Sequence, residues 1–245
     1  DMTKTLFAAL TLATTGIALS PLFAASNGVS PVSRDFMVSS VATLTLEGDI
    51  SATLIHDPRA KLIATAQQSD MDRRNIQRNG RSMRSTMEQS GQSYVRKGPV
   101  TLELRSADVE NITLNGGASL TADRLDQQRV TLGVFGSGAL SVGEVKADRL
   151  RINMMGSGAV LLGKGQVGKA DFVLDGAGRL DAGAVSINEL NVTSSGPTFI
   201  TAAANSTAEV RAYGAGSITI GGRAPCRIPY AAQANVECAG GVRQD

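Results

Sequence analysis

Six glycines mark turns at almost regular intervals through the second half of the chain. They are Gly116, Gly136, Gly156, Gly176, Gly196 and Gly214, four steps of twenty residues followed by one of eighteen. An apolar residue comes four positions after each of them, at Leu120, Leu140, Val160, Leu180, Ile200 and Ile218. A fixed repeat of this length is typical of a solenoid, in which each coil buries its apolar face against the next coil.

The segments between these glycines alternate between apolar and polar residues, as in Val130–Val134, Leu150–Met154 and Ala170–Leu174. Alternation with a period of two predicts strands with one buried face, and no stretch has the spacing of a long amphipathic helix. We therefore predict an all-β fold, a single-stranded parallel β-helix with coils of roughly 20 residues. Each coil is expected to have three short strands and two glycine corners. Parallel crossovers are usually right-handed, which predicts a right-handed coil.

The N-terminus has the features of an export signal. Lys4 precedes an apolar run from Leu6 to Leu19, and small residues up to Ala25 form a cleavage zone. Residues 1–25 are therefore predicted to be a signal peptide. The run is shorter than the roughly 20 apolar residues of a membrane-spanning helix, so we expect no transmembrane span in the mature chain. The expected location is the periplasm, the cell surface or the surrounding medium.

Four segments are expected after the signal. They are a flexible lead-in (26–35), an N-terminal β segment (36–108) that contains an arginine-rich loop (67–92), the β-helix coils (109–222) and a C-terminal cap (223–245). In the N-terminal segment, alternating stretches flank Glu47-Gly48-Asp49 and predict a strand, a turn and a second strand.

Cys226 and Cys238 are the only cysteines, and they lie just beyond the last glycine-marked coil. An even pair in an exported chain predicts a disulfide, which would staple the C-terminal cap to the end of the rod. Free thiols are the alternative. A metal site would need more ligands, and the single histidine, His56, is far away in sequence.

Composition and motifs argue against several functions. A formal net charge of +2, three tyrosines and no tryptophan do not suit a nucleic-acid binder. We expect no cofactor and no metal, because calcium-binding glycine repeats need a regularly placed aspartate and only Asp181 is near that place. Ser137 and Ser157 have no histidine nearby in sequence and are explained by turns.

An enzyme that cleaves polysaccharides would need two converging carboxylates. The available acids occupy different positions of the repeat and form no column: Asp123, Asp126, Asp148, Asp171, Asp175 and Asp181. We interpret them as solvated surface acids and predict a protein that is not an enzyme.

Two basic clusters are candidate binding sites. Arg129, Arg149 and Lys169 share one repeat position, so stacked coils would set them in a ladder that could bind an anionic polymer or simply extend into water. The second cluster, in the arginine-rich loop, could dock on an acidic partner or a membrane surface, or be a solvated, partly disordered loop. It consists of Arg73, Arg74, Arg78, Arg81 and Arg84.

The Gly-Ser-Gly and Gly-Ala-Gly corners followed by Leu, Val or Ile resemble the head GIN domain of the putative auto-transporter adhesin family. The last such coil is Gly214–Gly222, and the stretch from Phe36 to Leu104 is similar to the family's entry segment. The resemblance implies an exported, β-helical bacterial envelope protein with a non-enzymatic adhesive role. Expected partners are acidic glycans, lipid head groups or an envelope protein, and the rival functions are a polysaccharide-active enzyme and a self-associating structural component.

Overall fold

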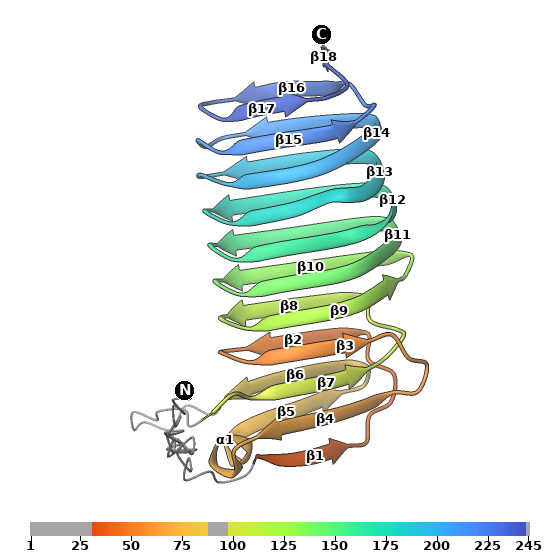
Figure 1. Ribbon diagram of the computed structural model, residues 1–245, viewed down its shortest axis with the longest axis vertical. Coiled ribbons are helices and arrows are strands. Elements are labelled where there is room, and N and C mark those ends of the chain that lie inside the picture. Colours follow the sequence, from red (N-terminus) through yellow and green to blue (C-terminus); the bar gives the residue numbers. More distant parts are fainter. Residues whose placement is uncertain (1–30, 88–97, 244–245) are drawn as a thin grey trace, which may run out of the picture.

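The protein is a rod of stacked β coils (Figure 1). The computed structural model describes residues 31–87 and 98–243, which form 18 strands and one short helix. The predicted all-β fold, a solenoid of parallel strands, is confirmed. The predicted signal peptide lies outside the described residues. Among the described residues no helix is long and apolar enough to cross a membrane.

Each coil passes once through each of two layers, which face one another across the core (Figure 1). Layer 1 contains β6 (Ser82–Met87), β2 (Thr43–Glu47), β8 (Asn111–Gly116), β10 (Arg129–Gly136), the second halves of four long strands, β16 (Cys226–Ala231) and β18 (Val242–Arg243). Layer 2 contains β7 (Thr101–Arg105), β3 (Ser51–Ile55), β9 (Ser119–Asp126), the first halves of those strands, β15 (Ser217–Gly222) and β17 (Asn235–Cys238). The long strands are β11 (Ala139–Gly156), β12 (Ala159–Gly176), β13 (Arg179–Ser195) and β14 (Phe199–Ala212).

The long strands differ from the expected three short strands per coil. β11 is one strand of 18 residues that passes around the second bend of the coil, where the chain turns from layer 2 into layer 1. It keeps the same register with β12 on both sides of this bend. Gly143 and Gly163 lie at this bend, where a Cβ on Gly163 would come 2.6 Å from the carbonyl oxygen of Gly143. These glycines therefore allow two backbones to approach closely within a continuous strand.

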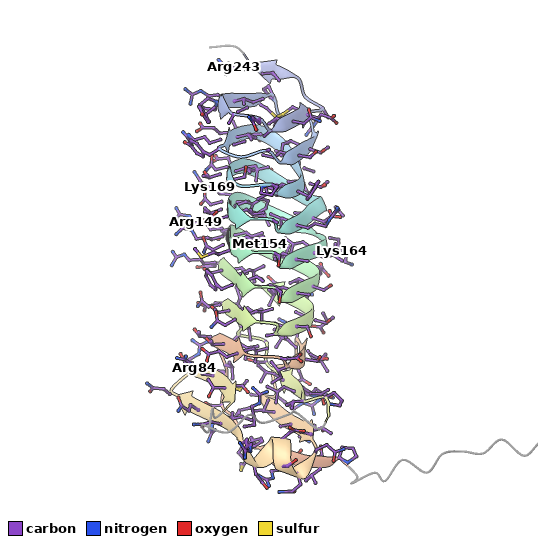
Figure 2. All side chains as sticks on the ribbon, turned by 90° about the vertical axis from the view of Figure 1, so that its left-hand side faces the viewer. Arg84, Arg149, Met154, Lys164, Lys169 and Arg243 are labelled. Carbon is purple, nitrogen blue, oxygen red and sulfur yellow. A yellow bond between two sulfur atoms is a disulfide. The ribbon has the colours of Figure 1, made fainter. Side chains whose placement is uncertain are left out.

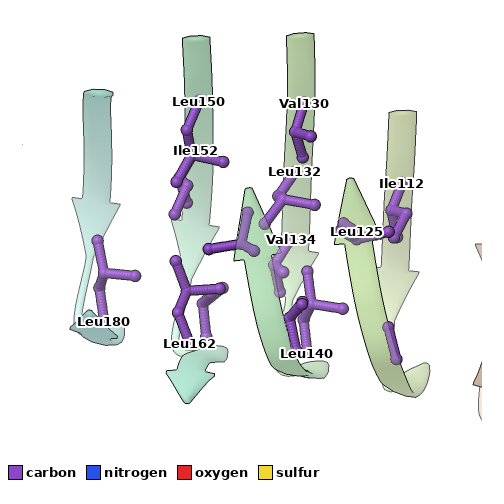
Figure 3. Close-up of a cluster of buried hydrophobic side chains, with 14 of the residues drawn as sticks. Ile112, Leu125, Val130, Leu132, Val134, Leu140, Leu150, Ile152, Leu162 and Leu180 are labelled. Atoms are coloured by element: carbon purple, nitrogen blue, oxygen red, sulfur yellow. The ribbon is translucent and has the colours of Figure 1, made fainter. Parts of the chain in front are cut away.

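Equivalent apolar residues lie directly beside one another along the rod. Leu140 is in register with Val160, and Val160 is in register with Leu180. All three are at most 2% exposed and belong to one continuous core (Figure 3). Each fully buried side chain of this kind stabilises the fold by roughly 1.5–3 kcal/mol, so the predicted columns hold the rod together.

The marked glycines form the tight corner at the ends of the layer 1 strands. Gly136 and Gly156 have φ values of +120° and +114°, a region that favours glycine. Gly214 keeps an ordinary φ but lies so near the preceding coil that a Cβ would be 2.2 Å from the Gly196 carbonyl oxygen. Both observations explain why glycine recurs at this corner.

The N-terminal segment joins the same stack in a different order from the sequence. β2 and β3 lie between the coil formed by β6 and β7 and the coil formed by β8 and β9. The expected strand, turn and strand around Gly48 are present, but β2 and β3 pair with neighbouring coils and not with each other. Gly48, with φ +82°, is therefore one more solenoid corner.

Antiparallel strands cover the N-terminal end of the rod. β4 (Lys61–Ala66) pairs antiparallel with β7, and β1 (Val32–Phe36) pairs antiparallel with β4. The expectation of a flexible lead-in over 26–35 is wrong for its described end, because Val32 onward forms β1. This arrangement occupies a strand edge that would otherwise be open to further pairing.

The arginine-rich segment is also more ordered than expected. Its described part forms a short helix, α1 (Gln68–Asp72), and an antiparallel hairpin of β5 (Arg74–Asn79) with β6. Residues 88–92 lie outside the described residues. The segment folds because β6 pairs with β2, which makes the hairpin part of the solenoid.

The C-terminal segment continues the stack as another coil, with β16 on β14 and β17 on β15. The predicted disulfide is confirmed: Cys226, at the start of β16, is bonded to Cys238, at the end of β17. It therefore closes the last coil across the two layers.

Candidate functional site

The outer face of layer 1 carries the predicted basic ladder. Arg129 is in register with Arg149, and Arg149 with Lys169, on three adjacent strands. Figure 2 shows Arg149 and Lys169 extending from the same side of the rod. The spacing of about 4.8 Å between strands places like charges close together. The ladder ends at Glu189, whose carboxylate pairs with Lys169 at 3.6 Å.

A fourth cation, Arg151, belongs to the same face and was missed from the sequence. It is two residues after Arg149 in β11, so both side chains point outward. The signal was present in the alternation, since position 151 is polar between two buried residues. No ion pair within residues 31–87 and 98–243 involves Arg129, Arg149 or Arg151. We call Arg129, Arg149, Arg151 and Lys169 the basic face.

The basic face borders a polar groove at the bend between the layers. A hollow of about 440 Å³ is lined by Glu110, Gln127, Gln128, Arg129, Asp148 and Arg149. An adjoining hollow of about 490 Å³ shares Gln127, Gln128 and Asp148 with it and continues past Lys146, Gln166 and Asn188. Amides, carboxylates and guanidinium groups together offer both donors and acceptors, which suits a hydroxyl-rich or anionic ligand.

Two of the predicted surface acids, Asp126 and Asp148, line the same hollow. Arg124 forms an ion pair with Asp126, so this carboxylate already has a cationic partner. Three others make structural hydrogen bonds: Asp123 accepts from the His56 backbone N–H, Asp171 from the Asn191 side chain, and Asp181 from the Gly183 backbone N–H. Asp175 is in register with Met155 on the neighbouring strand. The described residues hold no group of three or more side chains placed to bind a metal ion.

The arginine-rich cluster binds the rod itself. The Nη1 atom of Arg74, a buried residue, donates to the Glu47 carbonyl oxygen at 3.2 Å, and Arg84 pairs with the Glu47 carboxylate. Arg78 donates to the Met37 carbonyl oxygen, and Arg81 lies 3.8 Å from Asp108. Arg73, which is half-buried, lies at the end of α1. The hypothesis of a mobile docking loop is therefore replaced, for its described part, by a hairpin that its arginines tie to β2 and its surroundings.

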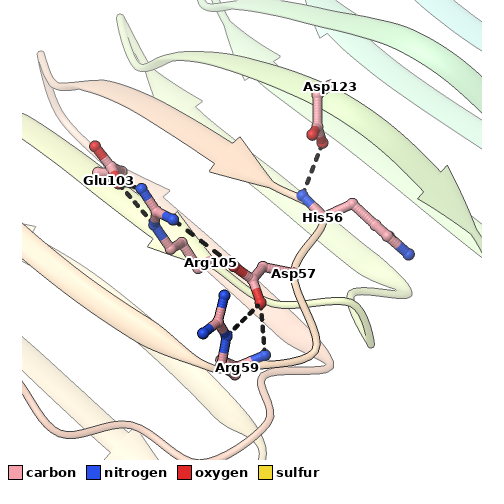
Figure 4. Close-up of polar contacts among 6 residues, drawn as sticks. All are labelled: His56, Asp57, Arg59, Glu103, Arg105 and Asp123. Carbon is pink, nitrogen blue, oxygen red and sulfur yellow. Dashed lines mark hydrogen bonds and ion pairs between the residues drawn. The ribbon is translucent and has the colours of Figure 1, made fainter.

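A second polar network fixes the loop after β3 (Figure 4). Asp57 accepts a hydrogen bond of 2.8 Å from the Arg59 backbone N–H and lies within ion-pair distance of Arg59 and Arg105. That backbone hydrogen bond, followed by the two guanidinium charges, lowers the pKa of the Asp57 carboxyl. Arg105 also pairs with Glu103 at 3.0 Å. These contacts are local to the loop and point to a structural role.

Residues 42–224 match the family described as "Putative auto-transporter adhesin, head GIN domain". The chain belongs to this family. The resemblance predicted from the glycine corners is thereby confirmed, and the match spans the coils from β2 to the start of the C-terminal segment. No curated protein matches the sequence.

Solved structures from Bacteroides and Parabacteroides species have the same fold. A putative adhesin from Bacteroides fragilis superposes with a TM-score of 0.76 at 17% identity, covering 88% of this chain and 95% of that one. A putative adhesin from Parabacteroides merdae gives 0.67 at 17% identity, covering 86% and 97%. A putative lipid binding protein from Parabacteroides distasonis gives 0.66 at 18% identity, covering 88% and 98%. At these identities the likeness shows that the GIN-domain chain shares their fold.

Proposed function

We propose that this GIN-domain protein is an exported, non-enzymatic adhesion module whose basic face binds anionic groups on a surface glycan or on lipid head groups. Its family is named for adhesion. The disulfide supports export, because such bonds persist in oxidising compartments outside the cytoplasm.

The observation that carries the proposal is that Arg129 and Arg149 are register neighbours and that neither forms an ion pair within residues 31–87 and 98–243. Most cations elsewhere on the described rod have an ion pair within the chain, as Lys164 has with Glu144 at 3.6 Å. Arg129 and Arg149 instead lie side by side, in a register that brings two positive charges together. A bound anion would relieve this repulsion and accept hydrogen bonds from both guanidinium groups.

The test is binding of the purified protein to acidic polysaccharides and to phosphatidylglycerol vesicles, with neutral polysaccharides and phosphatidylcholine vesicles beside them. We expect binding to one acidic class that weakens with salt, because exposed charges are screened. Substitution of Arg129, Arg149 and Lys169 by Ala should weaken it about tenfold or more, at roughly 0.5–1 kcal/mol for each exposed charge contact. Binding to the polysaccharides or to the vesicles identifies which of the two supplies the anion.

The matched control replaces Arg59, Lys61 and Lys164 by Ala, which removes the same charge from other parts of the surface. This variant should bind as the wild type does. Equal binding by the two triple variants would mean that net charge alone matters. The basic face would then not be the binding site.

An enzyme remains a second candidate because Asp126 and Asp148 line one hollow. Glycoside cleavage would need the two carboxylates about 5–9.5 Å apart with a sugar between them. Release of reducing ends from a polysaccharide panel, abolished by Asp148→Asn, would establish this activity in place of adhesion alone.

Self-association is a third candidate. Within the described part, β17 hydrogen-bonds to β15 and to no second strand, so one backbone edge is available at the C-terminal end of the rod. Analytical ultracentrifugation over a wide concentration range tests it: a monomer at every concentration would contradict self-association through this edge.

A further inference from the structure

Two exposed tyrosines stack on each other near the C-terminal end of layer 1. Tyr213 follows β14 and Tyr230 lies in β16, with ring centroids 5.0 Å apart and an angle of 26° between the ring planes. They are 55% and 49% exposed. The chain has three tyrosines and no tryptophan, and two of the three tyrosines meet here.

A β-bulge in β16 places Tyr230 on the outside of the rod. Arg227 is in register with Glu209, but Tyr230 is in register with Arg211, so β16 has one more residue than β14 in this interval. Without it, alternation would set Tyr230 opposite the buried Ala212 and point its ring inward. Bulges re-aim side chains and often lie beside functional sites. The extra residue falls at Ile228-Pro229, where proline lacks an N–H for pairing.

Charged side chains lie next to the stacked rings. Glu209 forms ion pairs with both Arg211 and Arg227, the latter at 3.1 Å. Arg211 is the register neighbour of Tyr230 and two residues from Tyr213. This trio offers guanidinium donors and carboxylate acceptors beside an aromatic surface, and the shared carboxylate offsets much of the positive charge. It differs in this respect from the basic face, where Arg129, Arg149 and Arg151 form no ion pair with another described residue, although Asp171 is the register neighbour of Arg151.

From these observations we propose that Tyr213 and Tyr230 form a platform that binds a ring of an uncharged glycan. One face of a sugar ring is made of C–H groups that pack on an aromatic ring, while hydroxyls at its edge accept from arginine and donate to glutamate. None of the hollows described above includes the tyrosine pair. Because the two rings stack, each covers one face of the other, and the sugar ring would pack on the part of the pair that stays exposed. The disulfide that joins β16 to β17 holds this coil in place before binding.

This inference rests on the proposed function, since it assumes that the rod is a binding module, but the two sites predict different salt dependence. Binding at the basic face should weaken as salt rises. Binding of an uncharged sugar at the tyrosine platform should change little, because packing and short hydrogen bonds are screened much less than exposed charges.

The experiment is a titration of the purified protein with cellohexaose, maltohexaose, chitohexaose and mannohexaose, followed by calorimetry and by tyrosine fluorescence, which no tryptophan obscures. We expect one of these probes to bind. Tyr213→Ala and Tyr230→Ala should each weaken that binding about five- to tenfold, and Tyr213→Phe should retain most of it. Binding should change less than about twofold between low and moderate salt.

Phe199→Ala is the matched control, since Phe199 is also 49% exposed but lies on the outer face of layer 2. It should bind as the wild type does. Circular dichroism and thermal unfolding check that the tyrosine variants keep the fold. Failure of all four oligosaccharides and of a broad array of neutral glycans to bind would overturn the platform, and so would wild-type binding by both alanine variants. Neither result would contradict the basic face, which is tested separately by salt-sensitive binding of acidic polymers.

Discussion

Gly156 lies so close to Gly136 on the neighbouring coil that a Cβ on Gly156 would be 2.5 Å from the Gly136 carbonyl oxygen. The atom in the way belongs to the backbone, so no side-chain movement can make room. Gly156 also has φ +114°, which strains any other residue.

Gly156→Ala should therefore destabilise the rod by about 2–4 kcal/mol, measured by denaturant unfolding. Gly117→Ala is the matched control, since Gly117 has no atom within 4 Å of the added Cβ. It should change stability by less than about 1 kcal/mol, with a small gain from the stiffer unfolded chain. Equal losses in the two variants would contradict this reading of the corner.

The alternation along β12 gives a second prediction. Phe172 is 1% exposed and fills the core, whereas Leu161 on the same strand is 49% exposed. Phe172→Ala should cost about 3–5 kcal/mol because it leaves a cavity, and Leu161→Ala less than about 0.5 kcal/mol. Thermal or chemical unfolding of both variants measures the difference, and a comparable loss at Leu161 would show that the outer face is covered.

Features that repeat every twenty residues could be predicted from the sequence. Leu140, Val160 and Leu180 had to stack, and the same register set Arg129 beside Arg149, because one coil differs from the next by a translation along the rod. Arg151 could have been added by extending the alternation two residues further. The corner glycines could be predicted because glycine alone allows two backbones to approach so closely.

Features that depend on contacts between distant segments could not be predicted in this way. The position of β2 between β6 and β8 follows from no local pattern, and the pairing of Arg84 with Glu47 depends on it. Without that neighbour, an arginine-rich stretch looks solvated. The outward turn of Tyr230 depends on one extra residue in β16, a break in the alternation that sequence reasoning relied on.

The disulfide gives a third prediction, for the last coil. Replacing Cys226 and Cys238 by Ala should destabilise that coil by about 3 kcal/mol, since the bridge closes a short loop in the unfolded chain. Hydrogen exchange should accelerate in β16 and β17 and remain slow in β11 and β12, because a solenoid can open at one end. Uniform acceleration along the rod would show that the coils unfold together.

The Asp57 network gives a prediction for pH. The Arg59 backbone N–H and the guanidinium groups of Arg59 and Arg105 hold the Asp57 pKa below its usual value of 3.8. A carboxyl whose pKa is lowered in the folded state stabilises the protein fully above its unfolded pKa, and this contribution is lost as the pH falls through the folded pKa. Asp57→Asn should therefore lower the Tm at neutral pH, and the difference from the wild type should shrink as the pH falls below about 4. Thermal unfolding of both proteins from neutral to acidic pH measures this, and a difference that stays constant over that range would mean that the carboxylate charge contributes nothing.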